Sequence, residues 1–172
     1  MTASKNQVRH LVYLFFFSLG AILTPVLFHQ LQLPGKVFIP LFAVILIGAP
    51  FFSLLEILSL ALVGPLINHI FFGMPVTAPL PILQMLIFEL AVLALLLNLA
   101  LKKLRLPVIL RFLLPLVLAR FSSIIFVVLS SPLTIQYWFQ NQQTSWPGIF
   151  LNTTLASLVF NLLSRETDSA KP

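Results

Sequence analysis

The sequence predicts an all-α integral membrane protein, a bundle of six transmembrane helices with both ends of the chain in the cytoplasm. Of its 172 residues 59% are hydrophobic and only 8% are charged, and the mean hydropathy is +1.07. A soluble domain carries about a quarter of its residues as charged side chains. The length suits about six spans of ~20 residues with short connections. We therefore expect residues 1–172 to form one integral membrane domain embedded in a lipid bilayer.

The first three predicted spans lie in the N-terminal half of the chain. Residues 11–31 form an apolar run that is too long for the core of a signal peptide, and no small-residue cleavage site follows it. Residues 37–48 are apolar but short, and Ala49-Pro50 ends them. Residues 51–72 form the third span, in which Pro65 predicts a kink.

The fourth and fifth predicted spans follow a proline-rich loop at residues 73–80. Pro81 suits the first helical position of the fourth span, residues 81–101, because that position needs no backbone N–H. The fifth span covers residues 107–130, and a proline in a helix interior removes a backbone hydrogen bond. We therefore expect the fifth span to be interrupted at Pro115.

The longest polar segment, residues 131–146, is predicted to be a loop that leads to the sixth span, residues 147–164. Threading six spans alternately places only Lys36 in a loop on one side of the membrane. Eight basic residues fall on the other side with both termini, and the positive-inside rule assigns that side to the cytoplasm. A net charge of +6 therefore reflects membrane orientation, and no nucleic acid partner is expected. The eight residues are Lys5, Arg9, Lys102, Lys103, Arg105, Arg111, Arg165 and Lys171.

Two opposite charges are predicted to lie at similar depth within the membrane. Glu89 lies about 12 Å below the outer end of the fourth span, and Arg120 about 15 Å below the outer end of the fifth, at a rise of about 1.5 Å per residue. Each charge alone would cost roughly 2.5–3.5 kcal/mol on insertion scales. Two interpretations remain open: the pair ties two helices together, or it binds a polar solute that enters from outside.

Further polar side chains fall near the same depth. Asn68 and His69 lie one turn below the outer end of the third span, Gln84 lies on the fourth span, and Asn152 lies on the sixth. Polar residues also cap helices at the membrane interface and pack between helices. These four residues therefore suit either ligand contacts or structural roles.

The chemistry of an enzyme is not evident in the sequence. There is no cysteine, and the three histidines show no spacing typical of metal ligands. No nucleotide-binding loop, no Ser–His–Asp order and no paired carboxylates occur. We expect no catalytic residues, no metal and no cofactor, which ranks a lipid-modifying enzyme last among the functions considered.

Several short motifs occur in a recognisable order, and they run from about His29 to Leu163. In order and spacing they resemble the substrate-binding S components of energy-coupling factor (ECF) transporters, which are bacterial vitamin importers. The chain departs from the family pattern at Phe38, where the family has histidine, and at Ala119, where it has glycine. The motifs are Phe38-Ile39-Pro40, Gly73-Met74-Pro75, Phe88-Glu89-Leu90-Ala91, Arg120 and Pro147-Gly148-Ile149.

The resemblance implies a multi-pass protein of the bacterial cell membrane that captures a vitamin or related small polar solute from the outer side. A T component and two ATPase subunits, supplied as separate chains, would then drive transport. The alternative is a small membrane scaffold or assembly protein whose buried charges are structural. The candidate substrate-binding residues are Arg120, Glu89, Asn68, His69, Met74, Gln84, Asn152 and Phe38.

Overall fold

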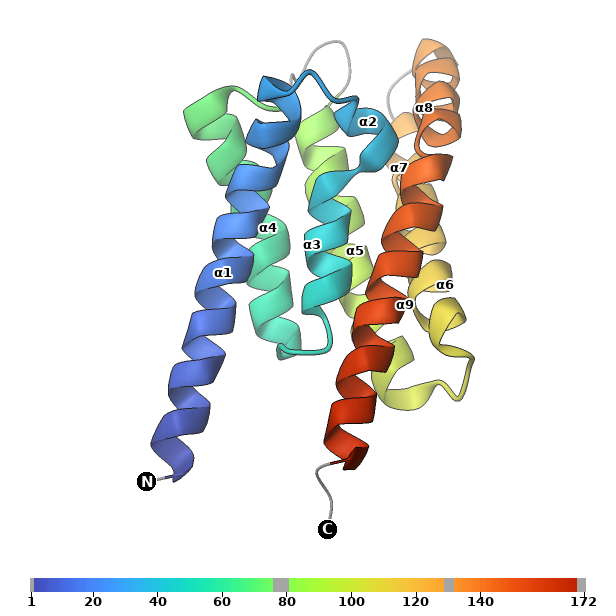
Figure 1. Cartoon of the computed structure of the whole chain (residues 1–172). Coiled ribbons are helices and arrows are strands. Elements are labelled where there is room, and N and C mark those ends of the chain that lie inside the picture. Colours follow the sequence, from blue (N-terminus) through green and yellow to red (C-terminus); the bar gives the residue numbers. More distant parts are fainter. Residues whose placement is uncertain (1, 76–80, 129–131, 170–172) are drawn as a thin grey trace.

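The computed structural model describes residues 2–75, 81–128 and 132–169, and within these ranges the backbone forms nine helices and no strand (Figure 1). The predicted all-α fold is therefore confirmed. The helices are α1 (Thr2–Gln30), α2 (Gly35–Phe38), α3 (Pro40–Gly48), α4 (Leu54–Phe72), α5 (Ile82–Lys103), α6 (Val108–Ser122), α7 (Ile124–Val128), α8 (Pro132–Thr144) and α9 (Trp146–Ser169).

Four helices in the described part of the chain are long and apolar enough to cross a membrane. They are the stretch Gln7–Gln30 of α1, the whole of α4 and α5, and the stretch Trp146–Ser164 of α9. The other two predicted spans fall on shorter helices. The span at residues 37–48 is divided between α2 and α3 because Ile39 has a left-handed backbone, with a φ of 43°. The described part of the span at residues 107–130 is divided between α6 and α7.

The break in this last span is not at Pro115, where the sequence predicted it. Helix α6 continues through Pro115 and ends at Ser122, while α4 likewise continues through Pro65. The hydroxyl of Ser122 donates a 2.6 Å hydrogen bond to the Ala119 carbonyl, and that of Ser123 donates a 2.9 Å bond to the Arg120 carbonyl. Serine hydroxyls that bind local carbonyls compete with the helical backbone bonds, which accounts for a break at this position.

The loop predicted at residues 131–146 is also wrong, because residues 132–144 form helix α8. Pro132 occupies the first helical position, and the rest of α8 contains neither glycine nor proline. Trp138 and Gln142, one turn apart, are both buried. A helix that buries only one narrow face is polar overall, so its composition resembles that of a loop. The predicted loop at residues 73–80 begins at Gly73, which has a φ of 66°, but residues 76–80 lie outside the described residues.

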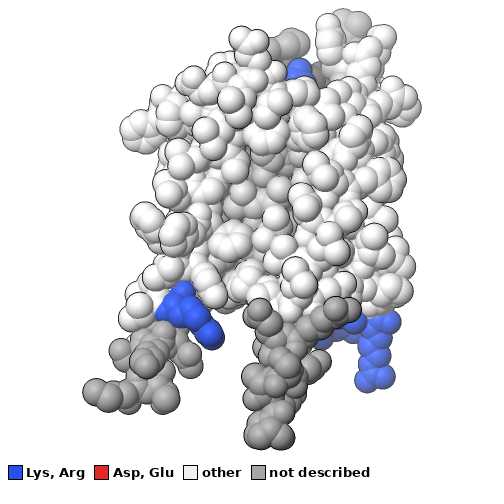
Figure 2. Space-filling model, viewed as in Figure 1, with Lys and Arg blue, Asp and Glu red and all other residues white. Residues whose placement is uncertain are grey.

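Both ends of the chain lie at the same end of the bundle, which we call the terminal end (Figure 1). Helices α2 and α8 lie at the opposite end, here called the cavity end. On the face shown in Figure 2, the basic side chains lie at the two ends, and the broad surface between them carries none. That distribution suits a protein whose middle is surrounded by lipid.

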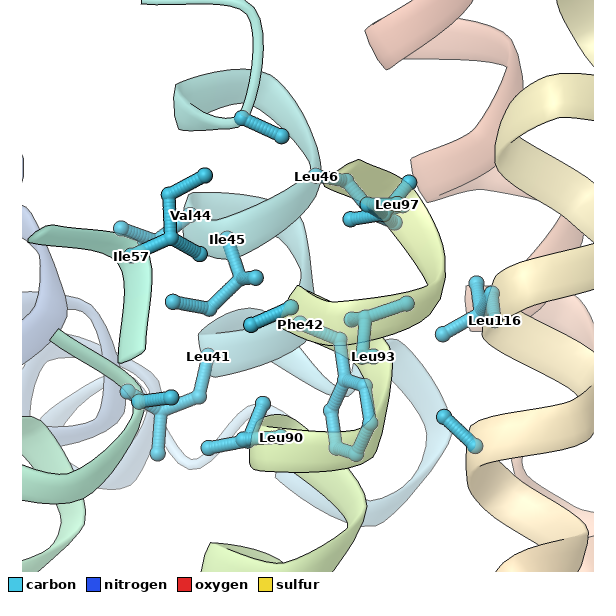
Figure 3. Close-up of a cluster of buried hydrophobic side chains, with 14 of the residues drawn as sticks. Leu41, Phe42, Val44, Ile45, Leu46, Ile57, Leu90, Leu93, Leu97 and Leu116 are labelled. Atoms are coloured by element: carbon cyan, nitrogen blue, oxygen red, sulfur yellow. The ribbon is translucent and has the colours of Figure 1, made fainter. Parts of the chain in front are cut away.

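The core of the bundle surrounds α3, whose side chains are buried on most sides. Phe42 and Ile45 of α3 pack among Leu90 and Leu93 of α5, and Leu116 of α6 closes the cluster (Figure 3). Lipid tails are as apolar as leucine, so helix association in a membrane rests on close packing rather than on escape from water. The interdigitated side chains around α3 supply that packing.

Candidate functional site

A cavity of about 580 Å³ lies at the cavity end of the bundle. The C-terminal turns of α1 and α4, the break between α2 and α3, the first turns of α5, the end of α6 and the inner face of α8 enclose it. The size falls within the range of about 300–1,000 Å³ that is usual for small-molecule sites. Six separate parts of the fold thus converge on one space.

The wall of this cavity is mostly apolar, with residues such as Phe28, Leu41, Phe42 and Met85. A smaller number of side chains that carry a polar or charged group are spread among them. Small-molecule sites commonly combine an apolar wall with a few placed polar groups, because the wall supplies contact area and the polar groups orient the ligand. The polar members are His29, Lys36, Asn68, Glu89, Arg120, Tyr137 and Asn141.

Glu89 and Arg120 form a direct ion pair in the cavity wall. Arg120 Nη1 donates to Glu89 Oε2, and the two residues are only 5% and 2% exposed. Counting the rise along two helices predicted the similar depth that this contact requires. Arg120 Nη2 donates a 3.2 Å hydrogen bond to Ser145 Oγ, and the guanidinium carbon lies 5.3 Å from the centre of the Phe42 ring. Both terminal nitrogens of Arg120 therefore have protein partners, and an aromatic face adds a cation–π contact.

A wider hydrogen-bond network ties α8 to this pair. The backbone carbonyl of Arg120, near the C-terminus of α6, accepts a 2.8 Å bond from Gln142 Nε2 and a 2.9 Å bond from Ser123 Oγ. Trp138 Nε1 in turn donates a 2.9 Å bond to Ser123 Oγ. The last carbonyls of a helix lack partners within the helix, so α8 and the α6–α7 corner satisfy one of them. Gln142 and Ser145 were not predicted as site residues; the spacing of Trp138 and Gln142 by one helical turn is the signal that could have found α8.

Four of the eight candidate residues line the cavity: Glu89, Arg120, Asn68 and Met74. Asn68 is 1% exposed, and its Nδ2 donates to the carbonyls of Ala21, at 3.0 Å, and Gly64, at 2.9 Å. Its amide nitrogen thus binds α1 to α4. Among the described residues, Asn68 Oδ1 has no hydrogen-bond partner.

The other four candidates lie outside the cavity. Gln84 is exposed on the outer surface of α5, and His69 is rotated away because successive helical residues point about 100° apart. Phe38 packs against Phe28 with 5.8 Å between ring centres, and with Asn152 it lines a second, smaller apolar cavity. That cavity, of about 380 Å³, lies among α1, α3 and α9. The structure gives these four residues no contact with the larger cavity.

Asn152 instead stabilises the break between α2 and α3. Its Nδ2 donates to the carbonyl oxygens of Phe38, at 2.9 Å, and Ile39, at 3.3 Å. One turn earlier in α9, Gly148 lies so close to α2 that an added Cβ would be 2.1 Å from the Val37 carbonyl oxygen. A broken helix at membrane depth exposes backbone groups that lipid cannot satisfy. Gly148 and Asn152 allow α9 to cover this break, and Ile39 and Pro40 thereby line the cavity.

Comparison of the chain with protein-family models, with curated proteins and with solved structures finds no match. The fold and the cavity therefore define the class of protein on their own. In its described residues the chain is all-helical, with four helices long and apolar enough to cross a membrane and with a cavity at one end of the bundle. The family resemblance of its motifs stays a prediction.

Proposed function

We propose that this chain is the substrate-capture subunit of an ECF-type importer in a bacterial cell membrane. It binds a vitamin or related small polar solute in the cavity from the outer side, and it delivers the solute together with a T component and two ATPase subunits. The observation that carries this proposal is the cavity at a single end of the bundle, with a charged pair in its wall. A capture subunit needs such a site, whereas a scaffold has no use for a solute-sized space.

The proposed topology has six spans, with α2–α3 and α6–α7 as broken spans beside the four long helices. Both termini and the end of α5 are cytoplasmic, with Lys102 and Lys103 in the last turn of α5 and Arg105 just after it, and the cavity end faces outward. The distribution of cations supports this orientation, because Lys36 of the short helix α2 is the only exposed lysine or arginine among the described residues of the cavity end. Helices interrupted at membrane depth are common where a transporter binds its solute.

Labelling of introduced cysteines tests the orientation, since the natural chain has none. Cysteine at Gln143, an exposed residue of α8, should react with a membrane-impermeant thiol reagent added to intact cells. Cysteine at Lys103 should react only after the membrane is permeabilised. The reverse pattern would invert the bundle and contradict capture from outside.

The function itself is tested by the small molecules that co-purify with the detergent-solubilised protein, identified by mass spectrometry. A captured solute should raise the thermal unfolding midpoint of the wild-type protein when it is added back. The double variant Glu89→Gln/Arg120→Met should fold and lose that response, because a ligand hydrogen bond to a charged group contributes roughly 1.5–3 kcal/mol. Lys102→Gln, at the terminal end, is the matched control and should respond as the wild type does.

A membrane scaffold is the second candidate function, and one observation favours it. Both terminal nitrogens of Arg120 already have protein partners, Glu89 and Ser145, so the charged pair forms without a ligand. A double variant that folds and still responds fully to an added solute would assign the pair a structural role. If no solute co-purifies and none stabilises the wild type, the scaffold function replaces capture.

A further inference from the structure

The formal charges of the side chains around the cavity do not sum to zero. Three of its lining residues carry a formal charge at neutral pH: Lys36, Glu89 and Arg120. Glu89 and Arg120 neutralise each other as an ion pair. Among the described residues the only other ion pair joins His10 and Glu56 at the terminal end, so Lys36 has no acidic partner. The cavity therefore has one uncompensated positive charge.

That charge lies where an incoming solute first meets the protein. Lys36 belongs to α2 at the cavity end and is exposed, whereas Arg120 is buried at the end of α6. The terminal nitrogens of Arg120 donate to Glu89 and Ser145, and its Nε is buried without a hydrogen-bond partner among the described residues. Arg120 therefore offers an arriving anion only a buried donor, and Glu89 already neutralises its charge. Among the described residues, no side chain or carbonyl accepts a hydrogen bond from the Lys36 ammonium, which has three hydrogens to donate.

No nearby acid cancels the field of Lys36. The chain contains four acidic residues. Glu89 is neutralised by Arg120, Glu56 lies in the first turn of α4, and Glu166 and Asp168 lie in the last turns of α9. The last three are at the terminal end, separated from Lys36 by about the length of α4, or roughly 28 Å at 1.5 Å per residue, and charges so far apart are screened by salt. A single uncompensated cation at a low-dielectric entrance attracts anions.

The rest of the cavity suits an apolar body. Phe28 and Leu33, which come shortly before Lys36 in the chain, line the same cavity, and Met85 and Leu86 contribute apolar wall from α5. We propose that the cavity takes amphipathic monoanions, whose carboxylate binds the Lys36 ammonium while an apolar body lies against these side chains. This inference rests on the proposed capture function and specifies the class of solute.

Three probes with one apolar body and different charges test the inference: 4-phenylbutanoate, 4-phenylbutanamide and 4-phenylbutylamine. Their binding to the full chain in neutral detergent is measured by ligand-observed NMR. The carboxylate should bind about fivefold more tightly than the amide, the size that a solvent-exposed ion pair supports, and the amine most weakly. Rising ionic strength should reduce the preference for the carboxylate.

Variants separate Lys36 from the general basic character of the chain. Lys36→Gln should abolish the preference for the carboxylate, Lys36→Arg should retain it, and Lys102→Gln at the terminal end should bind as the wild type does. Equal affinity for carboxylate and amide in the wild type would overturn the inference, and so would an equal loss in Lys36→Gln and Lys102→Gln. Failure of all three probes to bind also overturns it. The capture function is then decided separately by the co-purification experiment.

Discussion

Two glutamates pair with basic side chains at opposite ends of the molecule, in very different surroundings. At the cavity end, Glu89 and Arg120 lie between helices α5 and α6, and neither side chain is more than 6% exposed. At the terminal end, Glu56 meets His10 at 2.7 Å between α4 and α1, with side chains that are 28% and 41% exposed. The first pair is enclosed by protein, whereas the second is open to its surroundings.

The two pairs are completed in different ways. Besides His10, Glu56 has a partner close by in the sequence. Ser53 precedes α4 and forms a capping box with Glu56, in which each side chain binds the other residue's backbone. Arg120 donates to Ser145, which lies between α8 and α9, and its carbonyl accepts a hydrogen bond from Gln142 of α8. A charge at the end of a membrane helix can be satisfied by its neighbours in sequence, but a charge at depth needs partners from several helices.

The largest difference is expected when one partner of the buried pair is removed. Arg120→Met leaves Glu89 buried without its cation and should lower the free energy of unfolding by about 3–5 kcal/mol. Glu89→Gln/Arg120→Met should recover most of that loss, because packed neutral groups often replace a buried pair without cost. Thermal unfolding in detergent measures both. An equal loss in the single and double variants would contradict the view that the unpaired charge causes the damage.

The close contact between Gly148 of α9 and the backbone of α2 can also be disrupted by substitution. Gly148→Ala places a Cβ against the Val37 carbonyl oxygen and should cost about 1–3 kcal/mol in stability, as overpacking does. Gly35→Ala is the matched control on the other side of this contact. An added Cβ at Gly35 meets no atom within 4 Å, so stability should change by at most about 0.5 kcal/mol. Similar losses in both variants would show that α9 does not depend on close approach to α2.

A smaller loss of stability is expected when a hydrogen bond between α8 and the end of α6 is removed. Trp138→Phe keeps an aromatic ring but removes the 2.9 Å hydrogen bond to Ser123, which should cost about 0.5–1.5 kcal/mol. Trp146→Phe serves as the control, because Trp146 is exposed, and it should change stability by less than about 0.5 kcal/mol. Thermal unfolding in detergent compares the two. A neutral Trp138→Phe variant would mean that packing alone holds α8.

The smallest effect is expected at the exposed pair. His10→Gln should cost only about 0.2–1 kcal/mol, because a partly exposed ion pair is weakened by water and by salt. Added salt should reduce the difference between His10→Gln and the wild type while leaving the loss in Arg120→Met nearly unchanged. The measurement is the unfolding midpoint at low and high ionic strength. An equal response to salt at both pairs would contradict the contrast between them.

Features that depend on helical periodicity could be predicted from the sequence, whereas features that depend on partners far away in the chain could not. Counting residues along two apolar helices predicted a similar depth for Glu89 and Arg120, which their contact requires, but left open whether they pair with each other or with a ligand. Helix α8 could not be predicted in this way, because Gln142 binds the carbonyl of Arg120, 22 positions earlier in the chain, and polar composition alone is typical of a loop. Asn68 and His69 both lie one turn before the end of α4, but which of the two faces the cavity depends on the rotation of α4 against its neighbours.

The break at Ile39 shows the same limit. A β-branched residue rarely adopts a left-handed backbone, and nothing local in the sequence indicates that Ile39 does so. The break is stabilised by Asn152, which is 113 positions away in the chain. Pro40, at the first position of α3, was taken only as a family motif, although its position after Ile39 suits the start of a new helix.

The contact at Gly148 limits how the sequence of this protein can diverge. The atom that an added Cβ would meet is a backbone oxygen, which no substitution elsewhere in the chain can remove. While α2 follows this path, position 148 has to be glycine, and the carbonyls of the Ile39 break need a donor such as the Asn152 amide. The spacing Gly-x-x-x-Asn at the start of the last helix is therefore a signature by which distant relatives can be recognised after the apolar helices have lost detectable similarity.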